Sequence, residues 1–439
     1  MHAFAQWPSL AVVKPKRKVW TAVVLAVVAT GVVVLVFLNL VGNGKTIEKV
    51  IPPLYAVSDA SFERTMSNVL GPAILDGNQL TPLQNGDEIF PPMLKAIRSA
   101  KQTVNLESYI YWSGAIGHAF SDALSEQARA GVRTNLILDW AGSKDVDQHD
   151  LAQMRQAGVQ VELYNPLRWY HLDRVNNRTH RKLLIVDGRI GFTGGVGIAD
   201  KWQGHGDTPD HWRDSHFRVE GPVVAQLQAT FVDNWLKTRG ELLYGPTYFP
   251  RIEPHGDVKA QVRHSSLNDG AESVRLMYLL SISAARRSIL IANAYFIPDD
   301  LSVAMLVSAR QRGVKVQILV PGDKIDAPLA RHASRSRWGP LLEAGVEIFE
   351  YQPTMFHCKV MIVDGLWSSV GSTNFDSRSF RLNDEVNLNL LDAGVAQTLT
   401  AVFERDRAQS RAVSLQGWRG RGWVTRFTDF IVGLLRAEL

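Results

Sequence analysis

A pattern of three chemically active residue types occurs twice in the chain. His180, Lys182 and Asp187 lie in "HRKLLIVD", and "HCKVMIVD" repeats the spacing H-x-K-x-x-x-x-D from His357. Each copy is followed by a short apolar run and then by a Gly-Gly or Gly-Ser pair. A single match of this kind arises by chance, but two matches in equivalent surroundings favour a shared function.

The two histidines and two lysines suit attack on a phosphodiester. Alternate residues of a strand share a face, so His180 and Lys182 point the same way, as do His357 and Lys359. A neutral imidazole can form a covalent phosphohistidine, while a protonated one can donate to the leaving oxygen and later activate the incoming hydroxyl. The lysines neutralise charge that develops on the phosphate. This chemistry requires neither a metal ion nor a cofactor.

The carboxylates are expected to have different tasks. Asp187 and Asp364 complete the motif and are counted with the candidate catalytic residues. Because they follow their lysines by five residues, they fall on the opposite strand face, where they more readily hold backbone groups or a lysine. Asp214 in "HWRDSHF" and Glu385 in "RLNDEVNL" are better placed to orient an imidazole by accepting its second N–H.

Donors for the phosphate are predicted just after each motif. Glycine lets backbone N–H groups approach an anion at Gly195, and Ser372 and Asn374 add side-chain donors. A metal site at His205 and His211 in "HGDTPDH" is the alternative use of polar residues in this region, although no clear ligand set converges on them.

The motifs sit in a unit that is written twice. "TVNLESYIYW", "ARAGVRTNLILD" and "QAGVQVELYNP" precede the first motif, and "SILIANAYFIPD", "ARQRGVKVQILVP" and "EAGVEIFEYQP" precede the second. Helical segments that end in glycine and lead into β-branched runs predict an α/β fold with helices packed on a sheet. The glycines expected to end helices with a positive φ are Gly131, Gly158, Gly313 and Gly345.

Bulk composition narrows the class of protein. With 439 residues and 46% hydrophobic residues, the chain is long enough for two ordinary domains or one duplicated domain. A net charge of +5 suits an anionic partner. Cys358 is the one cysteine, so an internal disulfide and a multi-cysteine metal site are excluded.

The N-terminus carries a candidate membrane anchor. Residues 19–41 carry no charge and follow the basic run "KPKRK". A helix that spans the ~30 Å hydrocarbon core needs about 20 apolar residues, so this stretch is long enough. The alternative is a cleavable signal peptide, which typically has a shorter apolar region and a small-residue cleavage site. The basic flank places the N-terminus in the cytoplasm and the bulk of the chain on the outer face.

Two further segments are rich in aromatic and basic residues. "LRWYHLDRVNNR", residues 167–178, precedes the first motif and is expected to form a loop at the mouth of the site. The C-terminal segment, residues 418–439, is basic and aromatic with an apolar stretch. It is expected either to lie in a membrane interface or to dock on the body as a terminal helix.

The chain resembles the phospholipase D superfamily, whose signature is the doubled H-x-K motif with a trailing glycine and asparagine. Within it the chain is most similar to bacterial cardiolipin synthases, through "NLESYIYW", "HRKLLIVDGRIGFTGG", "WRDSHFRVEGP", "ANAYFIPDD" and "GSTNFDSRSFRLNDEVN". The resemblance covers almost everything from about Gln84 onward. It implies two α/β units on mixed β-sheets around one shared cleft.

The resemblance also implies roles for individual residues. His180 is the expected nucleophile and His357 the general acid, with Lys182, Lys359 and Asn374 on the phosphate. The sequence departs from the pattern at Gly197, which stands where the second copy has Asn374. A side-chain donor is therefore missing in the first copy, so either phosphate binding is asymmetric or a backbone N–H or a water takes the place of the amide.

For such an enzyme the implied reaction is transphosphatidylation. A phosphatidyl group moves from phosphatidylglycerol to the histidine with release of glycerol, and a second phosphatidylglycerol accepts it to give cardiolipin. Hydrolysis to phosphatidic acid and a nuclease of the same superfamily are the alternatives from related chemistry. A catalytically inactive membrane scaffold is the alternative from another class. The expected partners are phosphatidylglycerol and the membrane, without nucleic acid.

The expected organisation follows from these segments. A basic tail (1–18) precedes the transmembrane helix (19–41) and a linker region (42–83). Two phospholipase D-like units follow, at residues 84–250 and 258–439. The expected location is the cell membrane, with a single membrane crossing.

Overall fold

The computed structural model describes residues 20–22, 24–30, 47–166, 176–266 and 272–434. The chain forms two compact units, residues 1–48 and 49–439.

In the first unit, residues 20–22 and 24–30 are helical. The predicted anchor at 19–41 lies largely outside the described residues, as does most of the loop at 167–178. Within the described part of the chain, no helix combines the length and apolar character required to cross a bilayer.

The described part of the second unit is built on one sheet of 15 strands, in the order β17-β12-β11-β9-β13-β14-β16-β8-β1-β7-β6-β5-β2-β3-β4. The first-half strands are β1 Leu75–Gln84, β2 Thr103–Ser108, β3 Arg133–Asp139, β4 Gln160–Tyr164, β5 Leu183–Val186, β6 Ile190–Gly194 and β7 Ser215–Glu220. The second-half strands are β8 Val258–Ser265, β9 Ser288–Asn293, β11 Lys315–Pro321, β12 Glu347–Tyr351, β13 Lys359–Val363, β14 Trp367–Gly371, β16 Glu385–Leu391 and β17 Ser410–Val413. A separate pair joins β10 Phe296–Ile297 to β15 Phe375–Asp376.

The duplication is visible in the strand order. From the central β1–β8 pair outward, each half runs through one strand, a β-hairpin and then three parallel strands, β2-β3-β4 in the first half and β9-β11-β12 in the second. The mixed α/β architecture of two equivalent units is therefore confirmed. The two half-sheets are joined edge to edge through the antiparallel pair β1 and β8, a continuity that the repeats alone do not predict.

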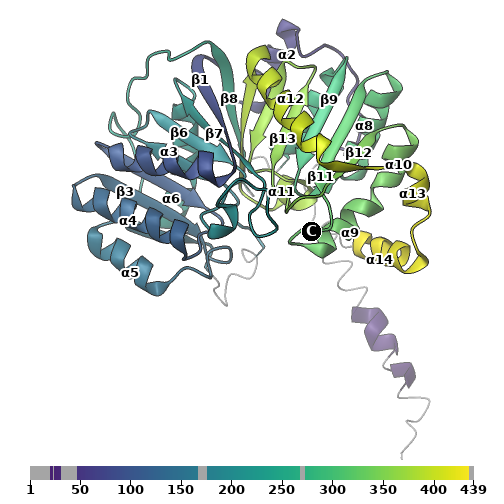
Figure 1. The fold of residues 1–439 in the computed structure, drawn as a ribbon, viewed down its shortest axis with the longest axis horizontal. Helices are drawn as coiled ribbons and strands as arrows, with labels where there is room; N and C mark the ends of the chain where they lie inside the picture. The colour runs from purple at the N-terminus through teal and green to yellow at the C-terminus, as the bar shows by residue number, and fades with distance from the viewer. Residues whose placement is uncertain (1–19, 23, 31–46, 167–175, 267–271, 435–439) are drawn as a thin grey trace, which may run out of the picture. The chain divides into compact units, whose positions relative to one another are not determined.

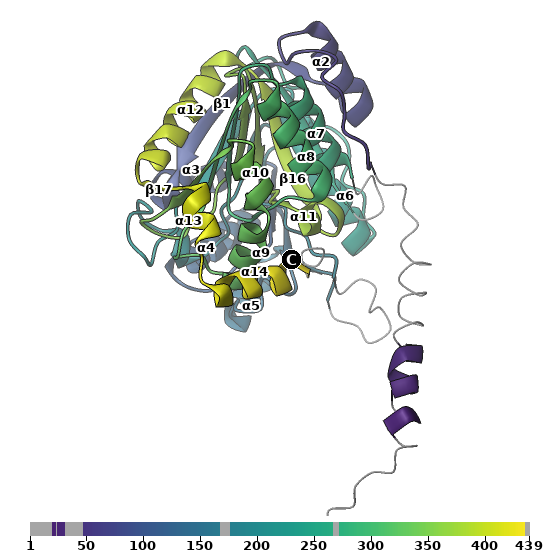
Figure 2. The same cartoon turned by 90° about the vertical axis from the view of Figure 1, so that its right-hand side faces the viewer.

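Helices cover both faces of the sheet. Figure 2 shows α3 and α12 on one side of the strands and α7 and α8 on the other. The helices are α2 Ala60–Thr65, α3 Asn85–Ser99, α4 Ala115–Arg129, α5 Gln148–Ala157, α6 Val224–Arg239, α7 Ser273–Ala284, α8 Asp300–Gln311, α9 Pro328–Ser336, α10 Trp338–Glu343, α11 Ser377–Arg381, α12 Ala393–Ala408, α13 Leu415–Arg419 and α14 Trp423–Leu434, with the short turns η1 Met66–Leu70 and η3 Asp200–Trp202. Figure 1 places α9 and α14 side by side, at the end of the unit opposite α2.

The glycines that were predicted to end helices have the positive φ that was expected of them. Gly158 caps α5 with φ 101°, and Gly131, Gly313 and Gly345 also have positive φ, between 84° and 89°. An L-residue with a side chain is disfavoured in this conformation, so glycine turns the chain from helix into strand.

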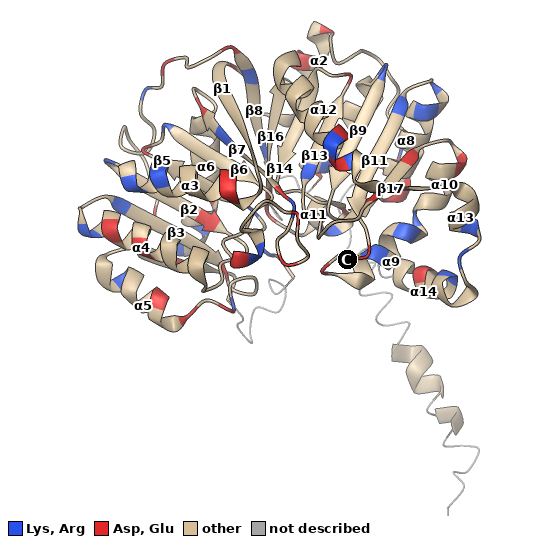
Figure 3. Ribbon diagram, in the orientation of Figure 1, with Lys and Arg blue, Asp and Glu red and all other residues tan. Residues whose placement is uncertain are grey.

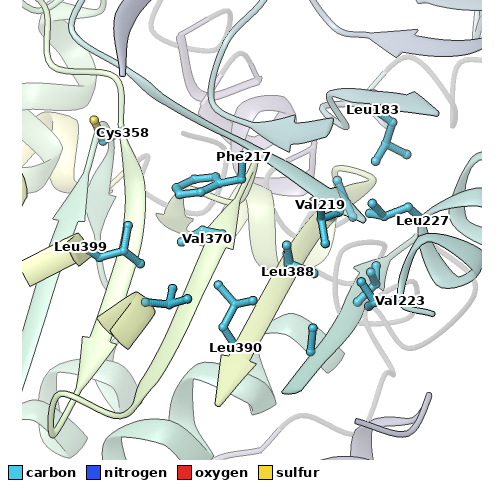
Figure 4. Packing of buried hydrophobic residues seen from close by; sticks show 14 of the residues in the cluster. Leu183, Phe217, Val219, Val223, Leu227, Cys358, Val370, Leu388, Leu390 and Leu399 are labelled. Atoms are coloured by element: carbon cyan, nitrogen blue, oxygen red, sulfur yellow. The ribbon is translucent and has the colours of Figure 1, made fainter. Parts of the chain in front are cut away.

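One hydrophobic cluster joins the two halves. Figure 4 shows Phe217 and Val219 from the first half close to Val370 and Leu388 from the second, and Leu183 belongs to the same cluster. Side chains from α6 and α12 complete this cluster. Because the halves share a core, the loops that each carries are held in a fixed relation.

Candidate active site

The two motif histidines are held in place by backbone bonds to the opposite half of the sheet. The N–H of His180 donates to the carbonyl of Asp384 (2.8 Å), and the N–H of His357 donates to the carbonyl of Arg213 (2.8 Å). Each carbonyl belongs to the residue directly before a predicted imidazole orienter. The backbone therefore aligns each histidine with a carboxylate of the other half.

Each histidine donates a hydrogen bond from Nδ1 to its orienting carboxylate, which belongs to the other half of the sheet. Nδ1 of His180 lies 2.9 and 3.0 Å from the two carboxylate oxygens of Glu385. Nδ1 of His357 lies 2.8 Å from Oδ2 of Asp214. All four side chains are buried. With Nδ1–H directed at a carboxylate, each imidazole keeps Nε2 for chemistry.

The two lysines lie against the same histidines. Nζ of Lys182 donates to the carbonyl oxygen of His180 (2.8 Å), and Nζ of Lys359 donates to that of His357 (2.6 Å). Nζ of Lys359 is also 3.2 Å from both ring nitrogens of His357. The structure thus brings together the imidazole and ammonium groups that the sequence pattern predicted to share a face.

Burial and charge set the protonation of these groups before substrate binds. Burial lowers the pKa of His180 to about 4, although Glu385 opposes this shift. Burial and then Lys359 lower the pKa of His357, against the effect of Asp214. Both imidazoles are therefore neutral around pH 7.

The lysines and carboxylates shift as well. Burial lowers the pKa of Lys182 to about 7 and also lowers the pKa of Lys359. Burial alone would raise the pKa of Asp214 and Glu385, but the imidazole that each binds and the nearby lysine outweigh it, so both pKa values lie below their ordinary range. Both carboxylates are therefore ionised and hold their imidazoles by charge-assisted hydrogen bonds.

Both histidines open on one cavity of about 700 Å³. Aromatic and aliphatic side chains share its wall with cationic and acidic ones. The lining includes Tyr109, Ile110, Trp112, Lys144, Arg178, His180, Lys182, Trp202, Trp212, Tyr295, Asp326, Pro328, Leu329, His357, Asn374, Asp376 and Arg378. Apolar walls around a few convergent polar groups are typical of a small-molecule site.

The motif aspartates have a structural task. Asp187 accepts hydrogen bonds from the backbone N–H groups of residues 101–103, and Asp364 accepts them from those of residues 286–288. Neither is among the described residues that line the cavity. Asp187 and Asp364 are therefore structural and not catalytic residues, which corrects the expectation. Each carboxylate joins the end of a hairpin strand to the start of β2 or β9.

Two of the predicted phosphate donors support the carboxylates instead. The N–H of Gly195 donates to the carbonyl of Ser215 (3.1 Å), and a Cβ at Gly195 would lie 2.1 Å from Oδ1 of Asp214. The hydroxyl of Ser372 donates to Oε2 of Glu385 (2.5 Å). Gly195 leaves room for the carboxylate of Asp214, and Ser372 holds the carboxylate of Glu385. The expectation that both residues bind the phosphate is therefore corrected.

The third predicted donor, Asn374, does face the cavity. It is 6% exposed, lines the cavity, and its carboxamide oxygen has no hydrogen-bond partner within the described part of the chain. A buried amide without a partner is costly, so this side chain is suited to a polar ligand.

The departure at Gly197 has a steric reason. A Cβ there would lie 2.8 Å from Cβ of Ile110 and 3.1 Å from the ring of Trp202. The indole of Trp202 lines the cavity and donates from Nε1 to Oδ2 of Asp214 (3.0 Å). The first half therefore places an indole where the second half has an amide, and the two sides of the site differ chemically.

The matched tyrosines were missed in the sequence. Tyr109 lies against His180 with ring centroids 5.1 Å apart, and Tyr295 lies against His357 at 6.3 Å. Nζ of Lys182 and of Lys359 sits over the ring of the same tyrosine, at 5.5 and 6.0 Å. The two tyrosines occupy equivalent positions in "ESYIYW" and "NAYFIPD", and this repetition could have identified them as site residues.

The alternative metal site has no support from geometry. Among the described residues, no group of three or more His, Cys, Asp or Glu side chains is arranged to hold a metal ion. Nε2 of His205 lies 3.3 Å from Oδ2 of Asp87, whereas His211 contacts the hydroxyl of Thr208. The two histidines thus have different partners.

Comparison with known proteins places these features in a family. The family described as "Cardiolipin synthase, PLD-like domain" matches residues 93–233 and 278–407, one segment in each half and more than half of the chain together. "Probable cardiolipin synthase YwiE" of Bacillus subtilis is 37% identical over 359 residues, which are 81% of this chain and 71% of that protein. "Cardiolipin synthase 2" of Staphylococcus epidermidis is 34% identical over 361 residues, which are 82% of this chain and 74% of that protein.

Solved structures agree on the fold. Phosphatidylserine synthase of Haemophilus influenzae superposes with a TM-score of 0.63 at 14% identity, covering 86% of this chain and 100% of that one. Polyphosphate kinase of Porphyromonas gingivalis gives a TM-score of 0.52 at 12% identity over 85% of this chain and 52% of that one. At such identities these likenesses establish the architecture alone.

Proposed function

The chain belongs to the cardiolipin synthase family of phospholipase D-like proteins, and from this premise we propose that it makes cardiolipin from two molecules of phosphatidylglycerol. The observation that carries the proposal is the pair of buried imidazoles, each hydrogen-bonded to a carboxylate of the other half, that opens on one cavity. Such a pair supplies a nucleophile and a proton carrier at the same phosphate.

The first half-reaction transfers the phosphatidyl group to the enzyme. Nε2 of neutral His180 attacks phosphorus and forms a P–N bond, while the P–O bond to the glycerol headgroup breaks. Nε2–H of His357 protonates the leaving oxygen, so glycerol departs neutral. The negative charge of the bound phosphodiester favours the protonated form of His357 that this step requires.

The second half-reaction regenerates the enzyme. His357, now neutral, accepts the proton of the terminal hydroxyl of a second phosphatidylglycerol. The hydroxyl oxygen attacks phosphorus, the P–N bond to His180 breaks, and cardiolipin leaves. His357 gives one proton to glycerol and takes one from the acceptor hydroxyl, so the cycle needs no external acid or base.

The remaining groups stabilise charge on the phosphate. Lys182 and Asn374 line the cavity, and Nζ of Lys359 lies 3.2 Å from both ring nitrogens of His357, which lines it too. Prepositioned donors of this kind stabilise developing charge because they need little reorganisation at the moment of reaction.

Hydrolysis is the second candidate function, and one observation favours it. The cavity that would admit the second lipid is wide, about 700 Å³, and water that entered it would meet the same imidazole base. The product would then be phosphatidic acid. The apolar part of the wall, which includes Trp112, Pro328 and Leu329, suits a lipid better than a nucleic acid strand, whose sites combine a basic track with the bases stacked on aromatic rings.

We further propose a single membrane crossing at residues 19–41, with the N-terminus in the cytoplasm and the catalytic part on the outer face. The support is the charge-free run of 23 residues and the basic residues of "KPKRK" that precede it. The phospholipase D-like units, expected at residues 84–250 and 258–439, are proposed with the first unit extended to Leu75, because β1 (Leu75–Gln84) belongs to its half of the sheet and not to a linker.

Incubation of the full chain with phosphatidylglycerol vesicles tests the reaction. Mass spectrometry of the lipids should find cardiolipin, with free glycerol in equal amount, and chelation by EDTA should leave the rate unchanged. The His180→Ala variant is the control and should lose the product. Phosphatidic acid without cardiolipin would replace the transferase with a hydrolase, and an active His180→Ala variant would exclude this site.

A further inference from the structure

The C-terminal helix α14 turns an apolar face to the outside. Trp423, Phe427, Phe430 and Leu434 are 79%, 60%, 62% and 61% exposed, and Ile431 beside them is 42% exposed. Spacings of three and four residues place these side chains on one face of the helix. A helix docked on a globular protein normally presents polar residues outward, so this arrangement is reversed.

The inner face of α14 is polar or small and is held firmly. Asp429 is 2% exposed, accepts from Arg421 (2.5 Å), and pairs with Nδ1 of His332 on α9 (2.7 Å). Val432 packs into an apolar cluster with α9, and a Cβ on Gly433 would lie 2.8 Å from Oγ of Ser336. The exposed apolar stripe therefore belongs to a docked helix with a fixed orientation.

The same helix α9 connects this face to the active site. Residues 327–330 at the start of α9 line the cavity, and Leu329 among them is 56% exposed. Figure 1 shows α14 lying directly along α9. The helix on which α14 is docked thus also supplies part of the cavity wall.

Positive charge gathers at the beginning of α14. A hollow of about 410 Å³ is lined by Trp418, Arg419, Arg421 and Arg426. Arg419 pairs with Glu343 (2.7 Å) and Arg421 with Asp429 (2.5 Å), and Arg426 lines the same hollow. In Figure 3 most of α14 is uncharged, with blue residues on α9 and α13 beside it.

We propose that the outer face of α14 inserts into the interface of an anionic phospholipid bilayer and holds the mouth of the active-site cavity against the lipid surface. This rests on the proposed function, because a substrate drawn from the bilayer must reach His180 through that mouth. Aromatic and aliphatic side chains flanked by arginine match both the hydrocarbon boundary and the anionic headgroups.

A second copy of the chain is a poorer occupant of this face. A symmetric dimer places the same patch of both subunits together, so two arginine clusters would meet at its edge. Anionic headgroups instead offer opposite charge at the place where the arginines lie.

A fluorescent probe on the full chain tests the insertion. Phe430→Cys carries an environment-sensitive maleimide dye, while Cys358 is buried with a pKa raised to about 12 by burial and does not react. Val69→Cys is the matched control, since it is 58% exposed and lies in η1, which follows α2 at the opposite end of the unit. In vesicles of phosphatidylglycerol with spin-labelled acyl chains, the dye at 430 should be quenched and blue-shifted, and the dye at 69 should not.

Two results would overturn the insertion. One is equal behaviour of the dyes at 430 and 69. The other is a shift at 430 that follows protein concentration without lipid, which would assign the face to a second copy of the chain.

An activity measurement separates this proposal from the reaction itself. The double variant Phe427→Asp, Phe430→Asp should turn over phosphatidylglycerol in vesicles at least about tenfold more slowly, because the apolar contact is lost. Its turnover of monomeric short-chain phosphatidylglycerol should be unchanged. Equal turnover of vesicles by variant and wild type, or an equal loss on both substrates, would reject the docking role. Absence of cardiolipin from the wild type on both substrates would reject the proposed function instead.

Discussion

Nδ1 of His180 lies 2.9 Å from Oε1 of Glu385, a residue 205 positions further along the chain and in the other half of the sheet. The reciprocal bond joins His357 to Asp214, 143 positions earlier. Each half thus supplies one imidazole together with the carboxylate that orients the other half's imidazole. The duplicated unit forms an active site when both copies pack together, and the core that the two halves share holds them in that arrangement.

Replacing Glu385 with Gln tests the crossed pairing. A glutamine has nearly the same shape but no charge, and its amide can turn the imidazole of His180 into the wrong tautomer. We expect kcat to fall by roughly 10³–10⁴-fold with little change in KM, as for carboxylate-to-amide changes in hydrolytic triads. Steady-state kinetics on phosphatidylglycerol vesicles measure both values. Glu126→Gln, an exposed carboxylate on α4, is the control, and a loss below about tenfold in Glu385→Gln would contradict the orienting role.

Removing the acid should trap the covalent intermediate. In His357→Ala, a phosphatidyl ester of p-nitrophenol still reacts, because nitrophenolate leaves without a proton. The second half-reaction then lacks its base, so we expect a phosphatidyl adduct on His180 that intact-protein mass spectrometry detects. The double variant His180→Ala, His357→Ala should form none. An adduct that forms in His180→Ala and not in His357→Ala would exchange the two roles.

The local part of this site was predictable from the sequence, and the long-range part was not. Strand periodicity placed His180 with Lys182 and moved Asp187 to the other face, where it binds backbone N–H groups. Asp214 and Glu385 were recognised as orienters, but their assignment to particular histidines depends on how the halves pack. No local pattern contains that information.

The sequence pattern also could not predict which side chains pack against the glycines of the site. The sequence predicts that Gly195 binds an anion, but the structure shows that a glycine is needed there because the carboxylate of Asp214 lies so close. From the sequence, Gly197 in place of an asparagine predicts the loss of a hydrogen-bond donor. The structure shows that the indole of Trp202 fills this space. Both depend on segments brought together by tertiary structure, which propensity and spacing do not report.

Both limbs of the pH profile of kcat/KM should lie at lower pH than the ordinary pKa values of histidine and lysine would give. Activity requires neutral His180, whose pKa is about 4, and cationic Lys182, whose pKa is about 7. It also requires protonated His357, and because burial lowers the pKa of this imidazole, its loss of the proton adds to the basic limb. As pH falls toward 4 the nucleophile becomes protonated, and as pH rises through 7 the lysine loses its charge. Because kcat/KM reports the free enzyme, the optimum should lie between these values. A profile with its acid limb at 6.5 and a plateau up to pH 9 would contradict the burial of both groups.

Buried histidines should also make the fold sensitive to acid. Burial lowers the pKa of His180 and His216 to about 4, compared with about 6.5 in an unfolded chain. Their contribution to stability is fully present above pH 6.5 and is lost as pH falls toward 4, because the unfolded chain binds the proton first. Each group adds up to about 1.4 kcal/mol per pH unit to the slope in that window.

Urea unfolding at pH 7, 6 and 5 measures this slope. His216 has both ring nitrogens buried without a hydrogen-bond partner among the described residues, so His216→Leu should flatten the dependence. His205→Ala, at an exposed position, should leave it unchanged. An identical slope in wild type and His216→Leu would reject the assignment.

The final prediction concerns the two residues that back the carboxylates. A methyl group at position 195 would lie 2.1 Å from Oδ1 of Asp214, so Gly195→Ala must displace this carboxylate from His357. Ser372→Ala removes one hydrogen bond to Glu385 and creates no clash. We expect Ser372→Ala to lower kcat by about 3–10-fold, the size of one hydrogen bond, and Gly195→Ala to lower it far more. Thermal unfolding of both variants separates this effect from loss of fold. Because the φ of Gly195 is open to any residue, a fully active Gly195→Ala variant would mean that Asp214 does not need its observed position to orient His357.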